Sequence, residues 1–131
     1  MLPLILILGQ LSTTLVLLQN TVGQSDAPDA MGVWINNLAE CESGNNPNAI
    51  NPHDPITASM GLLQFKKSTF INFSRKYHFF PETFTDNQIL EHIYDGHVQR
   101  TLARNMIVDR YENYLAWTNC VTKHGVGLPP K

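Results

Sequence analysis

The stretch WINNLAECESG, residues 34–44, has the spacing of an amphipathic helix that stops at a glycine. Its apolar positions recur at intervals of three and four residues, which places them along one face of a helix. The side chains on or beside this face are Trp34, Ile35, Leu38, Ala39 and Cys41. Glycine readily takes the left-handed conformation found after a helix C-terminus, and Gly44 stands at that point. We therefore predict a helix from Met31 to Ser43.

The next fifteen residues, 45–59, contain three prolines and four asparagines. Both residue types favour turns and interrupt regular backbone pairing, so we predict a long polar loop without regular structure. The apolar run Met60–Phe65 is too short to assign to a helix or a strand. A second helix is predicted for Ser68–Tyr77, followed by a second loop at residues 78–84 around Pro81.

The segment Thr85-Asp-Asn-Gln88 has the form of a capping box, in which the threonine and glutamine side chains each bind the other residue's backbone N–H. A single long helix is predicted after it, with an apolar face that runs from Leu90 to Leu102. Asp109 is predicted to cap a further helix, which stops at Gly125.

A chain of 131 residues has room for one domain once a targeting segment is set aside. We expect a mainly α domain over residues 31–128, with one long polar loop near its start. Nine Lys and Arg stand against eleven Asp and Glu. Nucleic-acid binders are usually strongly basic, so this balance argues against that class. We expect a monomer that uses no cofactor.

The N-terminal residues 1–23 have the outline of an export segment, with two apolar runs broken by a polar patch. The usual Lys or Arg of a signal peptide is missing, so an uncleaved signal anchor and a buried N-terminal helix stay as alternatives. Residues 24–30 are polar and carry Gly and Pro, which predicts a linker. The expected location is outside the cytoplasm: secreted, periplasmic or associated with the cell wall.

Export gives a meaning to the two cysteines, because an even number of cysteines in an oxidising compartment predicts a disulfide. The predicted bond joins Cys41 to Cys120 and closes a loop of about 80 residues, worth about 4 kcal/mol in the chain-entropy model. The alternative is two unpaired buried thiols.

Glu42 lies in the last turn of the first predicted helix, where the negative end of the helix dipole disfavours a carboxylate. Neighbouring apolar side chains add desolvation, and both effects raise the pKa of a carboxyl group. A carboxyl that stays protonated near neutral pH can protonate a glycosidic oxygen, so Glu42 is a candidate general acid. Glu40 is about 200° away around the helix and should face water. The alternative for Glu42 is a solvated glutamate at a helix end.

Three ordered motifs resemble those of the lysozyme-like superfamily: the stretch 34–44, which ends in Cys-Glu-Ser-Gly, then Asn-Asn-Pro-Asn-Ala-Ile-Asn-Pro (45–52), and Ser-Met-Gly-Leu-Leu-Gln-Phe (59–65). The first and third look like the Glu-Ser-Gly and Gly-Leu-Met-Gln motifs of lytic transglycosylases. They are also similar to the resuscitation-promoting-factor domains, in which a cysteine beside the catalytic glutamate pairs with one near the C-terminus. The resemblance spans residues 33–125 and is dense over 34–73. Three motifs in order are more specific than one.

This resemblance implies an enzyme that cleaves peptidoglycan glycan strands between N-acetylmuramic acid and N-acetylglucosamine. Glu42 matches the catalytic acid/base, and Gln64 matches the glutamine that lines the sugar cleft. Ser43, Ser59 and Met60 match motif positions beside that cleft. An alternative for Gln64 is an amide that only satisfies loop backbone.

Two positions depart from the family pattern. Leu63 replaces the usual methionine, and the tyrosine-containing Ala-Tyr-Asn motif is absent. The second departure leaves the aromatic wall of the site unassigned. The candidates for it are Tyr94, Tyr111, Tyr114 and Trp117.

In lytic transglycosylases one carboxyl suffices, because the sugar's own C6 hydroxyl attacks and closes a 1,6-anhydro ring. Such an intramolecular hydroxyl has a very large effective molarity. If Asp54 or Asp86 instead holds a water opposite Glu42, the protein is an inverting, lysozyme-type hydrolase. A non-catalytic glycan-binding or structural protein and a membrane-anchored scaffold are the remaining alternatives.

Two weaker patterns are set aside. A hydrolase triad of His53, Asp54 and Ser59 lacks the Gly-x-Ser-x-Gly turn that exposes such a serine. His92 and His97 are five residues apart and lack the His-Glu-x-x-His pattern of a helical zinc site, so no metal is expected.

Overall fold

The computed structural model describes residues 29–52 and 57–131, and over these the chain is mainly helical, as the sequence predicts. The helices are α2 (Ala30–Ser43), α3 (Lys67–Lys76), α4 (Asp86–Leu90), α5 (Gly96–Asp109), the 3-10 helix η1 (Tyr111–Trp117) and the π-helix η2 (Asn119–Lys123). The strands are β1 (Ile50–Asn51), β2 (Ser59–Met60) and β3 (Phe65–Lys66). The predicted export segment, residues 1–23, lies outside the described residues. No helix in the described part is long and apolar enough to cross a membrane.

Helix α2 begins and ends close to its predicted limits. It starts at Ala30, one residue before the prediction, because the Asp29 carboxylate accepts a hydrogen bond from the Gly32 N–H at 2.7 Å. Asp29, which the sequence places in the linker, also forms an ion pair with Arg104 of α5 at 2.7 Å. Gly44 has φ 62°, and its N–H donates to the Glu40 carbonyl, so the predicted glycine stop is confirmed.

The prediction of an entirely irregular 45–59 segment is wrong. β1 lies inside it and β2 begins at its last residue, Ser59, and with β3 they make a small antiparallel sheet in the order β1-β2-β3. Ile50 pairs with Met60, and Met60 pairs in turn with Phe65. Strands of two residues fit between the turn-forming residues, and most of their partners, Met60, Phe65 and Lys66, lie beyond the segment. The turn after β2 uses Gly61 at φ 82°, a conformation that side chains disfavour.

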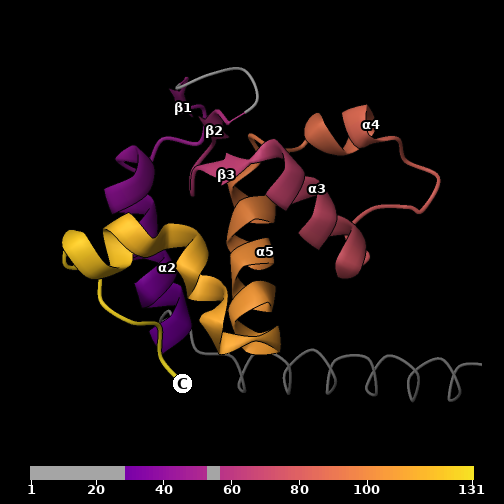
Figure 1. Cartoon of the computed structure of the whole chain (residues 1–131). Helices are drawn as coiled ribbons and strands as arrows, with labels where there is room; N and C mark the ends of the chain where they lie inside the picture. The colour runs from indigo at the N-terminus through magenta and orange to yellow at the C-terminus, as the bar shows by residue number, and fades with distance from the viewer. Residues whose placement is uncertain (1–28, 53–56) are drawn as a thin grey trace, which may run out of the picture.

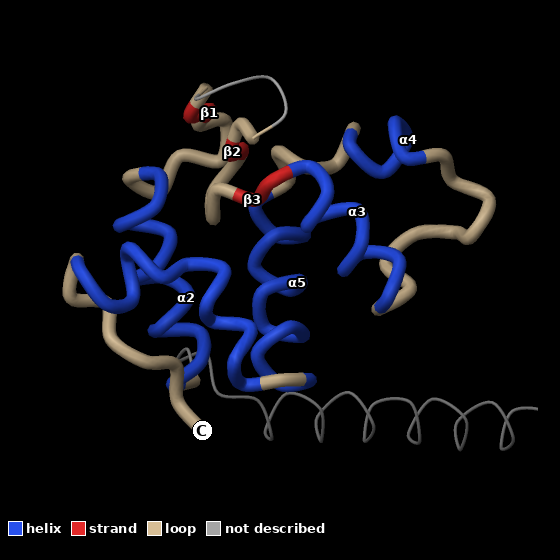
Figure 2. The backbone as a smooth tube through the Cα atoms, viewed as in Figure 1, coloured by secondary structure: helices blue, strands red, loops and turns tan. Residues whose placement is uncertain are grey.

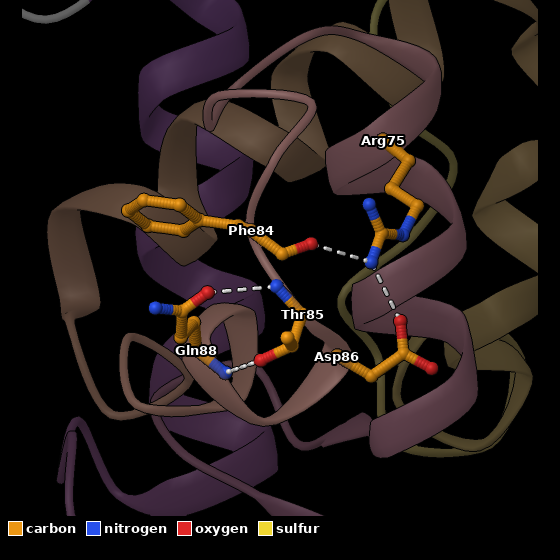
Figure 3. A network of polar contacts seen from close by, with 5 residues as sticks. All are labelled: Arg75, Phe84, Thr85, Asp86 and Gln88. Carbon is orange, nitrogen blue, oxygen red and sulfur yellow. Dashed lines mark hydrogen bonds and ion pairs between the residues drawn. The ribbon is translucent and has the colours of Figure 1, made fainter.

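The single long helix expected after residue 85 is also wrong, because the chain forms α4 and α5 with a turn between them (Figure 1). The predicted capping box that starts α4 is confirmed. Thr85 Oγ1 accepts from the Gln88 N–H, and Gln88 Oε1 accepts from the Thr85 N–H (Figure 3). The break arises at Asp95, whose carboxylate accepts from the His97 and Val98 N–H groups and so begins α5.

Arg75 joins α3 to the start of α4. One guanidinium nitrogen donates to the Phe84 carbonyl at 3.0 Å and to the Asp86 carboxylate at 2.7 Å (Figure 3). The aromatic rings of Phe80, Phe84 and His92 stack beside this junction.

Asp109 does not cap a helix, contrary to the prediction. It is the last residue of α5, and its carboxylate binds the Tyr77 hydroxyl at 2.8 Å and the Lys76 ammonium at 3.0 Å. The carboxylate is thus directed toward α3 and does not meet the next N–H groups. The chain continues as η1 and η2 instead of one α-helix, and Gly125 follows at φ 81°.

The core is formed by buried side chains from α2, α3, α4, α5 and the η1–η2 segment together with the turn between β2 and β3. Figures 1 and 2 show how these elements are arranged. The largest side chains fully buried in it include Leu38, Leu63, Phe70, Leu102 and Met106. Cys41 and Cys120 form the predicted disulfide, which excludes the alternative of two free thiols. The bond joins the C-terminal end of α2 to η2, and its two cysteines are 79 positions apart in the sequence.

Candidate active site

A cleft of about 480 Å³ opens where three parts of the chain meet: the end of α2, the small sheet with the start of α3, and the η1–η2 junction. Most of its described lining is polar. The lining residues are Glu42, Asn51, Ser59, Gln64, Phe65, Lys66, Thr69, Ala116, Trp117, Thr118 and Asn119. The size and polarity suit a ligand with many hydroxyl and amide groups.

Glu42 is the one carboxyl among the described residues of this lining. Its side chain is half-buried, and desolvation raises its pKa to about 7 from the ordinary 4.5. The predicted direction of the shift is therefore confirmed, and its cause is burial, the second of the two predicted causes. Glu40, two residues earlier, is exposed, as helical geometry predicts. A carboxyl with a pKa near 7 exists in both protonation states at neutral pH, as proton transfer requires.

The two residues that flank Glu42 fix the end of α2. Cys41 carries the disulfide to Cys120. The Ser43 hydroxyl donates to the Leu62 carbonyl at 2.7 Å and accepts from the Asn46 N–H at 3.0 Å. Ser43 therefore attaches α2 to the turn between β2 and β3, and it is not among the described residues that line the cleft. Its contacts hold the backbone on which Glu42 stands.

Gln64 lines the cleft together with Glu42, and its backbone has φ 55°. Its amide nitrogen donates to the Ala49 carbonyl at 3.2 Å and to the Gly61 carbonyl at 2.9 Å. These bonds agree with the alternative in which the Gln64 amide is a hydrogen-bond partner of loop carbonyl groups. They also fix the position of the Gln64 side chain in the wall of the cleft. Ser59 lines the cleft as well. Met60 does not belong to the described lining, and its carbonyl accepts from Gln99.

Trp117 is the member of the four aromatic candidates that lies in the described cleft lining. Its indole N–H donates to the Leu63 carbonyl at 2.8 Å, and its ring meets that of Phe65 edge-on with centroids 5.6 Å apart. Tyr111 and Tyr114 pack against each other, and the Tyr111 hydroxyl donates to the Pro129 carbonyl. The aromatic surface of the cleft therefore comes from Trp117 and Phe65.

Several residues of the cleft were not assigned to it from the sequence, although Asn51 and Phe65 stand in the motifs quoted above. The additional lining residues are Asn51, Phe65, Lys66, Thr69, Ala116, Thr118 and Asn119. Their places depend on contacts between distant segments, which no local pattern reports. The segment Trp117-Thr-Asn-Cys120 offered one signal, because the disulfide partner of Cys41 must bring its neighbours close to Glu42.

Gln99 was also missed, although it organises the wall of the cleft. It is fully buried, its amide oxygen accepts from the Leu63 N–H, and its amide nitrogen donates to the Met60 and Ile93 carbonyls. A polar residue on the same helical face as Leu102 and Met106 was the available signal. Gln99 crosslinks α5 to the turn that carries Gln64.

Asp54 and Asp86 were the two candidates for holding a water molecule opposite Glu42. Asp86 binds Arg75 and is not part of the described cleft lining. Asp54 lies outside the described residues, as does His53. His92, set aside as a metal ligand, stacks on Phe80 with ring centroids 4.8 Å apart.

Comparison with known proteins identified no relative of this chain. The chain matches no protein-family model, no curated protein and no solved structure.

Proposed function

We propose that the protein is a peptidoglycan-cleaving enzyme of the lytic transglycosylase type, with Glu42 as its acid and base. The observation that carries the proposal is a half-buried glutamate, with a pKa of about 7, on the wall of a polar cleft of about 480 Å³. The three motifs that resemble the lysozyme-like superfamily contribute Glu42, Asn51, Ser59 and Gln64 to this one cleft. Residues 31–128 form the proposed catalytic domain.

The proposed reaction uses one carboxyl group twice. Protonated Glu42 donates its proton to the bridging glycosidic oxygen, and the bond between that oxygen and the anomeric carbon of N-acetylmuramic acid breaks. The C6 hydroxyl oxygen of the same sugar then bonds to the anomeric carbon, and its proton passes to the Glu42 carboxylate. The products are a 1,6-anhydro end and a new free hydroxyl, and the enzyme is restored.

Polar and aromatic neighbours suit the rest of a sugar substrate. Asn51, Ser59 and Asn119 offer hydrogen-bonding groups for hydroxyl and acetamido substituents. Trp117 is 3% exposed, so it contributes an apolar edge to the wall behind these groups. The half-buried position of Glu42 keeps its proton available at neutral pH, where an exposed glutamate has already lost it.

The decisive experiment is mass spectrometry of the fragments released from purified peptidoglycan. Anhydro products are about 18 Da lighter than hydrolysis products, the mass of one water. Full-mass reducing ends would make the protein a lysozyme-type hydrolase. Muropeptide binding without any released fragment would make it a non-catalytic glycan-binding protein.

Glu42→Gln is expected to abolish release of soluble fragments, because the amide is close in shape but cannot transfer the proton. The loss should be at least about a hundredfold, the usual size of a general-acid contribution. Glu40→Gln is the matched control: it makes the same change two residues away on the exposed side of α2 and should keep activity. Retained activity in Glu42→Gln with an intact fold, checked by circular dichroism, would overturn the assignment.

A further inference from the structure

The cleft contains one cationic side chain among its described lining residues, Lys66. Lys66 is the last residue of β3 and precedes α3, and its side chain makes no capping hydrogen bond there. None of the ion pairs found among the described residues involves it. Lys66 is an exposed residue of the cleft, and no carboxylate in the described part of the chain is paired with it.

Glu42 and Lys66 stand on different elements of the cleft wall, at the end of α2 and at the end of β3. Glu42 is the one carboxyl and Lys66 the one cation among the described lining residues. While Glu42 is protonated, the described lining therefore carries a net positive charge.

The neighbourhood of Lys66 adds further features that suit an anion. Thr69, in the first turn of α3, lines the cleft with a hydroxyl group. The N-terminal end of a helix also favours negative charge nearby. Lys67, the next residue, does not line the cleft, so the charge inside it comes from Lys66.

Resting on the proposed function, we propose that Lys66 is a specificity residue that binds a carboxylate attached to the N-acetylmuramic acid unit of the substrate. That carboxylate has two sources: the stem peptide, or the lactyl group itself once the peptide has been removed. N-acetylglucosamine carries no acidic group, so the contact distinguishes peptidoglycan from a neutral glycan such as chitin. Lys66 positions the strand and takes no part in proton transfer.

The test measures cosedimentation of the full chain with insoluble peptidoglycan in the Glu42→Gln background, which prevents digestion. Three preparations are compared: intact peptidoglycan, peptidoglycan stripped of peptides by an amidase, and peptidoglycan whose carboxylates have been converted to amides with carbodiimide and ammonia. Binding to the intact and stripped preparations separates stem-peptide carboxylates from the lactyl carboxylate. The amidated preparation removes both.

On substrate that carries carboxylates, Lys66→Ala should weaken binding by about three- to fivefold and Lys66→Glu by more, as expected for one solvent-exposed ion pair. On the amidated preparation the Lys66 variants should bind as well as the Glu42→Gln protein that retains Lys66. The matched control, Lys67→Ala, removes the neighbouring charge and should leave binding to all three preparations unchanged. Equal binding by Lys66→Ala and its parent on intact and stripped substrate, or the same loss on all three preparations, would overturn the proposal.

This readout is independent of turnover. If the protein with Glu42 intact releases no fragments while binding still depends on Lys66 and on the carboxylates, the enzymatic proposal fails and the specificity proposal stands. If fragments are released but the Lys66 variants bind and cleave all preparations as well as the protein with Lys66 intact, the specificity proposal fails and the enzymatic proposal stands.

Discussion

Burial of Glu42 couples its protonation to folding. Its pKa is about 7 in the fold and 4.5 when unperturbed, so between these values the folded chain binds the proton more tightly than the unfolded chain. The stability contributed by this group is complete below about pH 4.5 and is lost as the pH rises through 7. We expect Glu42→Gln to exceed wild type in unfolding free energy by about 1–2 kcal/mol at pH 8 and to equal it at pH 4, after allowance for partial solvent exposure. Urea denaturation at both pH values checks this, and an equal difference at the two would contradict it.

The same ionisation should govern activity. Because the proposed reaction begins with protonated Glu42, the rate at limiting substrate should fall about tenfold per pH unit above about pH 7. Fragment release measured from pH 5 to pH 9 gives the profile. Glu40→Gln should leave the midpoint unchanged, since Glu40 lies on the exposed side of α2. A rate that stays constant up to pH 9 would argue against Glu42 as the acid.

At the level of elements, Gln99 connects α5 to the turn between β2 and β3. Gln99→Leu would leave the Leu63 N–H and the Met60 and Ile93 carbonyls without these partners in the core. We expect a loss of about 2–4 kcal/mol in unfolding free energy, because buried polar groups without partners are costly. Activity should fall as well, since Gln64 stands on the same turn. Chemical denaturation and fragment release are the measurements.

The control for that substitution is Gln88→Leu on α4. Gln88 is exposed, and the change removes only its half of the capping box with Thr85. The expected loss is less than about 1 kcal/mol, with no change in activity. Comparable losses from the two substitutions would show that Gln99 has no special role in holding the cleft wall.

Across the whole molecule, the Cys41–Cys120 bond joins the helix that carries Glu42 to the segment that carries Trp117 and Asn119. Replacing both cysteines with serine should lower the unfolding free energy by up to about 4 kcal/mol, from the entropy of the released loop. Thermal unfolding with and without reductant checks this. Reductant should destabilise wild type and leave the double variant unchanged. A wild-type melting temperature that ignores complete reduction would contradict the prediction.

Local sequence rules located the features that are decided within a few residues. The limits of α2 follow from apolar spacing and from Gly44, and the start of α4 follows from the Thr85–Gln88 box. The disulfide follows from the cysteine count and the expected export. The direction of the Glu42 pKa shift was predicted from its place at the end of an apolar helical face, although its burial in the cleft also needs the distant residues of the wall. The helix limits and the disulfide depend on neighbours along the chain or on a covalent bond.

Tertiary contacts decided the rest. The same local rules predicted one helix where Asp95 begins a second, and they assigned a cap to Asp109, which instead binds Tyr77 and Lys76. The small sheet and the cleft required segments from both ends of the domain to meet. Gln99 shows the physical reason: its three hydrogen bonds reach residues 6, 36 and 39 positions away. Such partners are determined by how the elements pack in three dimensions, so they cannot be predicted from the periodicity of the sequence.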